Sequence, residues 1–267
     1  MPGFVKRLAV VALGALALSA CNKPVEDFKE EGQVDILELL NKEDQLYQDM
    51  TIQSTYKKRV MTYSVWLPNG YDKRKEYPFL YLLHGYEQGD QSHLDRCWVE
   101  KGNARAIAQE YVKKGGVPMV IVMPNGLSDF YMGDYEQYFN EELMPKVESI
   151  YKCNGKRAIS GLSMGGFGTV YHALKYPQKY TYAYAMSPAV NDSMVSMVTD
   201  VSVLPGMTIE TGEDDTTTKM EDITPFVNAM KEKGYVIEYI TRPGIHYWNF
   251  WQECLPKALQ KIGESFK

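Results

Sequence analysis

The segment from residue 157 to 175 carries the most specific chemical pattern in the chain. Within it, Gly161-Leu162-Ser163-Met164-Gly165 fits the pattern G-x-S-x-G. Residues 157–160 can end a strand and residues 166–175 can form a helix. A serine between two such elements is typical of a nucleophile elbow, a tight turn that exposes the hydroxyl. The pattern therefore predicts Ser163 as the nucleophile of a covalent acyl-transfer reaction, with an ordinary glycine-rich turn as the alternative.

A serine hydroxyl is a poor nucleophile at neutral pH, so it needs a base, and four histidines are available. His246 follows the last predicted strand, residues 235–241, in a loop that contains glycine. His172 falls inside a predicted helix and His93 in a polar loop. His84 ends a strand but precedes the serine, whereas the α/β-hydrolase order is Ser, acid, His. We therefore assign the base to His246.

The acid that orients the base is expected after the strand at residues 207–211. Three consecutive carboxylates, Glu213, Asp214 and Asp215, follow it, and any of them could be a solvated loop side chain. We favour Asp215, with Asp214 as the alternative. Either choice keeps the chain order Ser, Asp, His.

The tetrahedral intermediate of acyl transfer needs two N–H donors for its oxyanion. The elbow geometry makes the Met164 N–H the first of them. The second is expected from the loop after the buried strand at residues 79–83, which gives the Tyr86 N–H as the candidate. Gly85 would let that backbone approach closely, although it could also be a simple turn glycine.

These side chains must be positioned by a regular alternation of strands and helices. Continuous apolar runs such as residues 79–83 are typical of strands buried on both faces of a parallel sheet. The alternation predicts an α/β fold with a mainly parallel central sheet and helices on both faces. The order Ser, acid, His is the one that the α/β-hydrolase fold uses, so that fold is expected. The expected strands are 60–67, 79–83, 119–123, 182–186, 207–211 and 235–241, and the expected helices are 98–114, 135–151, 166–175, 223–233 and 250–262.

The first twenty residues resemble an export leader. Lys6 and Arg7 precede an apolar run at residues 8–18 that is too short to span a membrane. Leu18-Ser19-Ala20-Cys21 resembles a bacterial lipobox, which implies cleavage before Cys21 and lipidation of that cysteine; a plain secretory signal is the alternative. The predicted organisation is a lipoprotein signal peptide (1–20), an acidic tether (21–46) and a catalytic domain (47–267), held at the cell envelope on its periplasmic or outer side.

Charge and cysteine usage narrow the possible partners. The formal net charge of −5 becomes −7 once the two basic residues of the leader are removed. No basic patch is visible, so nucleic acid is not expected as a partner. Three cysteines remain beside Cys21, namely Cys97, Cys153 and Cys254, so one disulfide is plausible and its pairing is left open. No metal-ligand spacing occurs, and no metal or cofactor is predicted.

Four stretches carry a family resemblance: YPFLYLLHGY, GLSMGGFGTVYHALKYP, TGEDD and GIHYWNFWQECLP. Together they resemble the putative-esterase family of α/β hydrolases over about residues 55–265. That family includes feruloyl and acetylxylan esterases, S-formylglutathione hydrolases, enterochelin esterases and the mycolyltransferases of the antigen 85 group. The resemblance implies Ser163 as nucleophile, Asp215 as acid, His246 as base, and Tyr86 and Met164 as the oxyanion hole. The residue after the histidine, Tyr247, departs from the acidic or small residue that is common there.

The sequence indicates the substrate through two features, the leader and the aromatic residues near strand ends. The leader counts against a formylglutathione substrate. Aromatic residues near predicted strand ends, with Trp248 and Tyr131 as expected substrate contacts, suit aromatic or sugar esters, although each alone could be a packing residue. The expectation is a serine carbohydrate esterase of feruloyl or acetylxylan type that acts on plant polysaccharide or its oligosaccharides. The alternatives are an acyltransferase or an esterase on a non-carbohydrate ester with the same triad, and, more remotely, an inactive glycan-binding protein.

Overall fold

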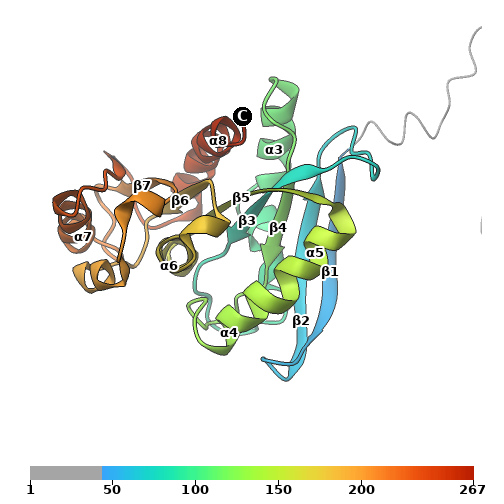
Figure 1. Cartoon of the computed structure of the whole chain (residues 1–267), viewed down its shortest axis with the longest axis horizontal. Helices are drawn as coiled ribbons and strands as arrows, with labels where there is room; N and C mark the ends of the chain where they lie inside the picture. Colours follow the sequence, from blue (N-terminus) through green and yellow to red (C-terminus); the bar gives the residue numbers. More distant parts are fainter. Residues whose placement is uncertain (1–43) are drawn as a thin grey trace, which may run out of the picture. The chain divides into compact units, whose positions relative to one another are not determined.

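A computed structural model describes residues 44–267, which form one eight-stranded sheet covered by helices (Figure 1). The strand order is β1-β2-β4-β3-β5-β6-β7-β8. Strands β3 to β8 are parallel, whereas β2 runs antiparallel to β4 and β1 antiparallel to β2. The strands are β1 (Gln45–Ser54), β2 (Arg59–Leu67), β3 (Tyr77–Leu83), β4 (Val120–Pro124), β5 (Cys153–Leu162), β6 (Tyr182–Met186), β7 (Gly206–Gly212) and β8 (Glu238–Arg242).

Helices lie on both faces of this sheet. The α-helices are α2 (Cys97–Glu100), α3 (Ala104–Lys113), α4 (Asp134–Gln137), α5 (Met144–Tyr151), α6 (Met164–Lys175), α7 (Met220–Glu232) and α8 (Trp248–Ser265). A π-helical turn, η2 (Tyr138–Leu143), joins α4 to α5. Short 3-10 turns are η1 (Leu94–Arg96), η3 (Pro177–Lys179), η4 (Asp192–Met197) and η5 (Val201–Val203). The predicted α/β-hydrolase fold class, with a mainly parallel sheet, is confirmed.

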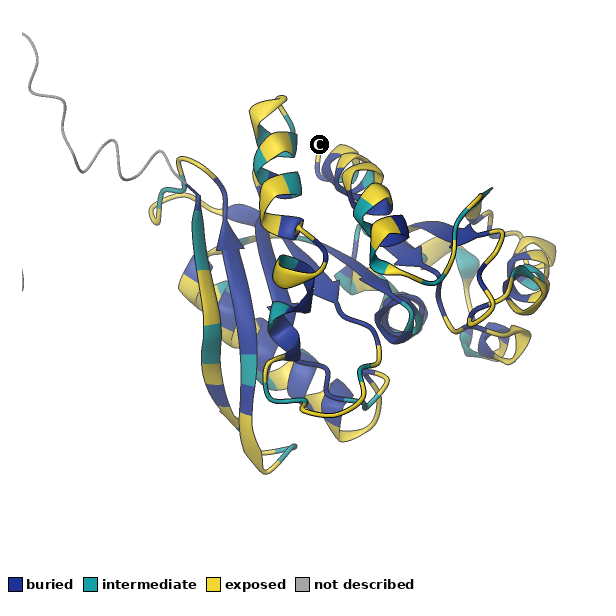
Figure 2. Ribbon diagram, turned by 180° about the vertical axis from the view of Figure 1, so that it is seen from behind, coloured by how far each residue is buried: buried dark blue, intermediate teal, exposed yellow. Residues whose placement is uncertain are grey.

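A hydrophobic core lies on each face of the sheet, and the central strand β3 contributes side chains to both. All seven of its residues are buried, and successive side chains point to opposite faces. Phe79 and Tyr81 pack into the core under α4, α5, α6 and α7, whereas Leu80 and Leu82 pack into the core under α2, α3 and α8. Figure 2 shows the inner strands and most of α6 as buried, while α3, α7 and α8 have exposed outer sides. A sheet buried on both faces requires the continuous apolar runs seen in the sequence.

The structure differs from the prediction at the helix expected over 98–114 and at the edge strand β1. The single helix expected over 98–114 is two helices, because Asn103 has a left-handed φ of +52° that interrupts the helical hydrogen-bond ladder. Strand β1 was not expected from the sequence pattern. It is an edge strand with an irregular register between Tyr47 and Met50, and its burial is partial, so its alternation is weak.

The start of the domain also lies earlier than predicted. Asp44 is buried, and its carboxylate accepts hydrogen bonds from Trp66 Nε1 at 2.7 Å and Arg105 Nε at 2.8 Å. Residues 44–46, assigned to the tether, are therefore part of the folded domain. The signal peptide, the lipidation site at Cys21 and the rest of the tether lie outside the described residues.

The three cysteines of the domain are unpaired. Cys97 and Cys254 are buried, Cys153 is half-buried, and none of them forms a disulfide. The pairing considered plausible from the sequence is therefore absent from residues 44–267. Within the same residues, no helix is both long and apolar enough to cross a membrane.

Candidate active site

The turn between β5 and α6 has the geometry of a nucleophile elbow. Ser163 stands between the two elements with φ +53° and ψ −116°, a combination rare for residues other than glycine. A Cβ on Gly165 would lie 2.4 Å from the Leu83 carbonyl oxygen, so only glycine lets α6 start this close to β3. The Ser163 N–H donates to the Met186 carbonyl at 2.9 Å, which ties the turn to β6.

Three predicted residues meet at this turn. Ser163 Oγ lies 2.9 Å from His246 Nε2, and His246 Nδ1 lies 2.7 Å from Asp215 Oδ2. The three come from the carboxyl ends of β5, β8 and β7, which lie at one edge of a parallel sheet. Because a carboxylate only accepts, the Nδ1–H of His246 donates to Asp215, and Nε2 is left to accept the Ser163 hydroxyl proton.

The carboxylate of Asp215 is fixed by four hydrogen bonds. Its Oδ1 accepts from the Thr217 and Thr218 N–H groups at 2.9 and 2.8 Å, and its Oδ2 accepts from the Thr218 hydroxyl at 3.0 Å and from His246. Burial alone would raise the pKa of Asp215, but the hydrogen bonds from His246 and the two threonine N–H groups outweigh it and lower the pKa to about 2. Asp214 is exposed, with no side-chain contact to His246.

The two expected oxyanion donors lie beside the nucleophile. Met164 is the first residue of α6, and N–H groups in the first turn of a helix have no partner within it. Gly85 and Tyr86 line the same pocket as Ser163. The Tyr86 side chain itself is half exposed. The N–H groups of Met164 and Tyr86 remain the predicted donors to the negative charge that would develop on a carbonyl oxygen under attack.

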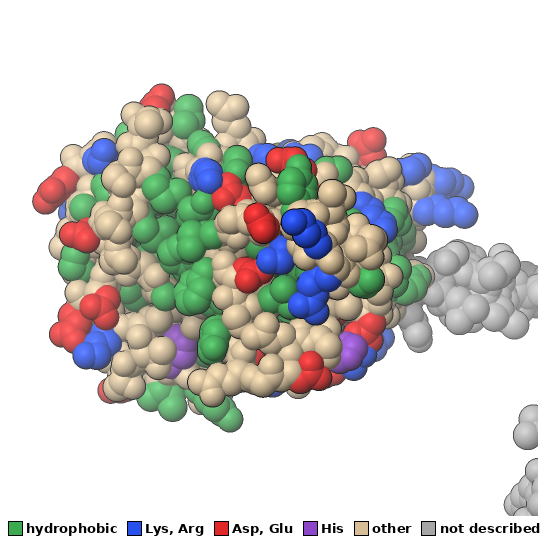
Figure 3. Space-filling model, turned by 90° about the horizontal axis from the view of Figure 1, so that it is seen from below, with side chains coloured by type: hydrophobic (Ala, Val, Ile, Leu, Met, Phe, Trp, Pro, Cys, Tyr) green, Lys and Arg blue, Asp and Glu red, His purple; other side chains and the backbone are tan. Residues whose placement is uncertain are grey.

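A pocket of about 680 Å³ opens beside Ser163. Trp248 lies in its wall and packs edge-on against Trp251, whose ring in turn meets the His246 imidazole edge-on at 4.9 Å. Figure 3 looks onto this end of the sheet, where apolar side chains gather to the left of centre with charged side chains of both signs around them. The lining residues are Gly85, Tyr86, Glu87, Lys101, Leu162, Ser163, His246, Tyr247, Trp248, Asn249, Trp251 and Gln252.

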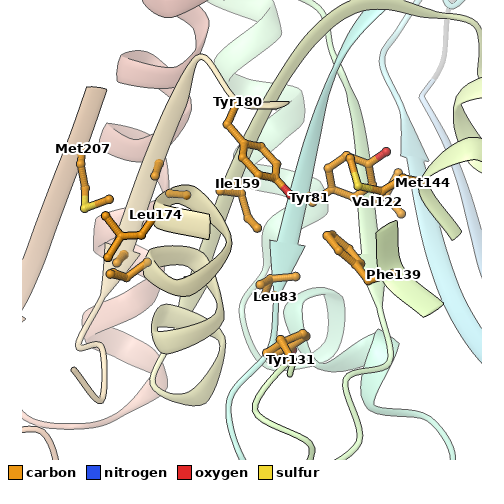
Figure 4. Close-up of a cluster of buried hydrophobic side chains, with 14 of the residues drawn as sticks. Tyr81, Leu83, Val122, Tyr131, Phe139, Met144, Ile159, Leu174, Tyr180 and Met207 are labelled. Carbon is orange, nitrogen blue, oxygen red and sulfur yellow. The ribbon is translucent and has the colours of Figure 1, made fainter. Parts of the chain in front are cut away.

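Tyr131 is not part of this pocket, so its prediction as a substrate contact is wrong. Its side chain is fully buried, and its hydroxyl donates to the His84 carbonyl at 2.9 Å. Figure 4 shows it beneath the end of β3, close to Leu83. The ring packs edge-on against Tyr135 in the core, where no substrate can reach it.

The pocket also contains polar residues that the sequence analysis did not identify. Glu87 and Lys101 form an ion pair of 2.8 Å, and the Lys101 carbonyl accepts from Gln252 at 2.7 Å. Gln252 follows Trp248 by four residues on α8, so helical spacing could have placed both on one face. Glu87 and Lys101 are not part of any sequence pattern that would have placed them beside the pocket. Among residues 44–267, no group of three or more His, Cys, Asp or Glu side chains is arranged to hold a metal ion.

Comparison with known proteins identifies the family of this chain. Residues 54–262 match the family described as putative esterase. The chain is 28% identical over 234 residues to an endo-1,4-beta-xylanase/feruloyl esterase of Xylanibacter ruminicola, a match that covers 80% of this chain and only 31% of that longer protein. It is 24% identical over 229 residues to an acetyl esterase of Caldicellulosiruptor saccharolyticus, covering 68% of this chain and 81% of the relative.

Two solved structures of ferulic acid esterases share the fold of this chain. A ferulic acid esterase superposes with a TM-score of 0.75 and 26% identity, covering 85% of this chain and all of the other. A ferulic acid esterase of Anaeromyces mucronatus, with a TM-score of 0.71 and 20% identity, covers 84% of this chain and 92% of its own and shares the fold. The chain thus belongs to the putative esterase family of α/β hydrolases, a family of serine carboxylic ester hydrolases.

Proposed function

We propose that this protein hydrolyses esters carried by plant-type carbohydrate, of feruloyl or acetyl type, through an acyl-enzyme on Ser163. The observation that carries the proposal is the hydrogen-bonded series from Asp215 through His246 to Ser163, beside a pocket with a tryptophan wall. This series provides a nucleophile, a base and an orienting acid in the order and spacing that acyl transfer needs.

In the proposed reaction, Ser163 Oγ attacks the ester carbonyl carbon while His246 Nε2 takes its proton. Asp215 stabilises the imidazolium, and the N–H groups of Met164 and Tyr86 donate to the oxyanion. Collapse of the intermediate breaks the bond to the alcohol, which leaves with the proton from His246. Water then attacks the acyl-enzyme with His246 again as base, so that the acid is released and the serine hydroxyl restored.

The substrate class is supported by the pocket and by the relatives. An aromatic acyl group or a sugar ring can pack against Trp248, and the nearby Gln252 and Asn249 can hydrogen-bond to hydroxyl groups. The relatives named above include a feruloyl esterase and an acetyl esterase, so both acyl groups remain candidates. No cofactor is part of the proposal.

We also propose that the protein is a lipoprotein of the cell envelope, anchored through Cys21. The support is the sequence of the leader alone, with its lipobox-like Leu18-Ser19-Ala20-Cys21. Replacing Cys21 by serine should move the protein from the membrane fraction to the soluble fraction of its host. Unchanged fractionation of Cys21→Ser would count against lipidation.

The catalytic proposal is tested by assaying the full chain beside Ser163→Ala on p-nitrophenyl acetate, methyl ferulate and acetylated xylan. Ser196→Ala, which removes an exposed hydroxyl on η4, is the matched control. We expect ferulate or acetate release by the wild type and by Ser196→Ala only. Cleavage of p-nitrophenyl acetate alone would remove the carbohydrate assignment, and a product that requires an added alcohol acceptor would indicate an acyltransferase. Equal rates for Ser163→Ala and the wild type would exclude Ser163 as nucleophile.

A further inference from the structure

The loop that follows β3 is held by an unusual set of side-chain hydrogen bonds. Three consecutive carbonyl groups, from the last residue of β3 into this loop, each accept from a buried side chain. The Leu83 oxygen accepts from Trp98 Nε1 at 2.9 Å, the His84 oxygen from the Tyr131 hydroxyl at 2.9 Å, and the Gly85 oxygen from His84 Nδ1 at 2.6 Å. The last contact differs from the others because it fixes the peptide group that carries the Tyr86 N–H.

The two ring nitrogens of His84 have unambiguous roles. The Gly126 N–H lies 2.7 Å from Nε2, and a backbone N–H can only donate, so Nε2 is the acceptor. The Gly85 carbonyl can only accept, so Nδ1 carries the proton. The ring is buried, and burial lowers the pKa of His84 to about 4, which keeps this neutral tautomer at physiological pH. Every hydrogen-bonding group of the side chain is thus in use.

The Gly85–Tyr86 peptide bond is trans, so its C=O and its N–H point in opposite directions. Holding the Gly85 oxygen on His84 therefore also sets the direction of the Tyr86 N–H. This peptide lies against the nucleophile turn, since a Cβ on Gly85 would stand 3.4 Å from the Ser163 Cβ and 2.6 Å from Leu162 Cδ1. His84 thus holds the carbonyl edge of this peptide, and the opposite edge carries the N–H of Tyr86, a residue that lines the same pocket as Ser163.

We propose that His84 is a positioning residue for catalysis: by binding the Gly85 carbonyl, it aims the Tyr86 N–H at the oxyanion. The inference rests on the proposed function and adds a role to a residue that never touches substrate. Removing one oxyanion donor typically lowers kcat by roughly 10²–10³-fold. A donor that is misaligned, but present, is expected to cost roughly 10–100-fold.

Two substitutions separate this role from a merely structural one. In His84→Asn the side-chain amide can still donate to the Gly85 oxygen, but the acceptor for Gly126 is lost. In His84→Gln the longer amide can still accept from Gly126, but the donor to Gly85 is lost. Each variant loses one buried hydrogen bond. We expect His84→Gln to lose roughly 10–100-fold in both kcat and kcat/KM with KM unchanged, and His84→Asn to stay within roughly fivefold of wild type.

The assay uses the full chain and p-nitrophenyl acetate, with the melting temperature of each variant measured in parallel. Tyr131→Phe is the matched control, because it removes the bond to the neighbouring His84 carbonyl and leaves the Gly85–Tyr86 peptide tied. It should lower the melting temperature with kcat within about threefold of wild type.

Equal losses in the Asn and Gln variants, or losses that follow the melting temperatures of all three proteins, would overturn the proposal. If only one variant folds, the result is still decisive: undiminished kcat in His84→Gln, or a hundredfold loss in His84→Asn, is incompatible with it. A wild-type chain that cleaves no ester refutes the proposed function and this inference together. If the wild type is active and His84→Gln has the same kcat, only the inference about His84 is refuted and the proposed function stands.

Discussion

Replacing Asp215 by asparagine should disable the proposed triad while leaving its shape intact. Two backbone N–H groups, from Thr217 and Thr218, donate to Oδ1. An asparagine will therefore place its carbonyl oxygen at that position, and its NH₂ group will take the place of Oδ2. The NH₂ group then faces His246 Nδ1 at about the present 2.7 Å and donates to it.

This forced donation reverses the imidazole tautomer. With Nδ1 accepting, the proton moves to Nε2, which can no longer take the proton of Ser163 at 2.9 Å. In serine-protease triads the same tautomer error lowers kcat by roughly 10⁴-fold. That factor corresponds to about 5 kcal/mol of lost transition-state stabilisation. KM should change little, because the substrate pocket is unaltered.

The measurement is kcat at pH 7 for Asp215→Asn on p-nitrophenyl acetate, with Asp214→Asn as the matched control. Asp214 is the adjacent residue and bears the same charge, but its side chain is exposed and its N–H donates to the Gly244 carbonyl. The control should keep kcat within about twofold. More than a tenth of wild-type activity in a folded Asp215→Asn, or a comparable loss in Asp214→Asn, would show that the acid has been assigned wrongly.

Three further predictions follow. Trp248→Ala should raise KM for methyl ferulate roughly tenfold, by loss of aromatic packing, with little change for an aliphatic acetate ester; equal effects on both esters would remove Trp248 from acyl recognition. Gly165→Ala should lower the free energy of unfolding by about 3 kcal/mol or prevent folding, because its Cβ would press on the Leu83 carbonyl; unchanged denaturation midpoints would contradict this. Burial lowers the pKa of His84 and His172 to about 4 from 6.5 in the unfolded chain. The unfolded chain binds more protons between these values, so stability should be complete above pH 6.5 and fall by up to about 3 kcal/mol per histidine as the pH drops to 4; urea unfolding that is independent of pH in this window would refute it.

The parts of the fold that the sequence predicted are those with a local signature. Buried parallel strands such as β3 are continuous apolar runs, and the nucleophile turn has glycines at fixed positions around Ser163. His246 and Asp215 could be chosen because each follows a strand and because parallel strands end at one edge. The sequence left Asp214 as an alternative to Asp215, because only the turn after β7 decides which of two adjacent carboxylates faces inward.

What the sequence did not predict depends on packing between distant segments. Tyr131 lies in a loop near a strand end, as a substrate contact would. Its neighbours in the sequence do not indicate that its ring packs on Tyr135 in the core, or that its hydroxyl donates to the His84 carbonyl. Asp44 likewise resembles the acidic residues that precede it. Its inclusion in the domain is due to Trp66 and Arg105, which are far away in the chain.

The unpaired thiols have a consequence for how the protein can be handled. Burial raises the pKa of Cys97 to about 11 and that of Cys254 well above its ordinary value, so both stay as unreactive thiols at neutral pH. Residues 44–267 are therefore held together without a covalent cross-link, and reducing agents should neither unfold the domain nor inhibit it. Because residues 44–267 contain no disulfide, the domain does not require an oxidising compartment to fold, and it can be produced in a reducing cytosol. The proposed export is therefore supported by the first twenty-one residues alone.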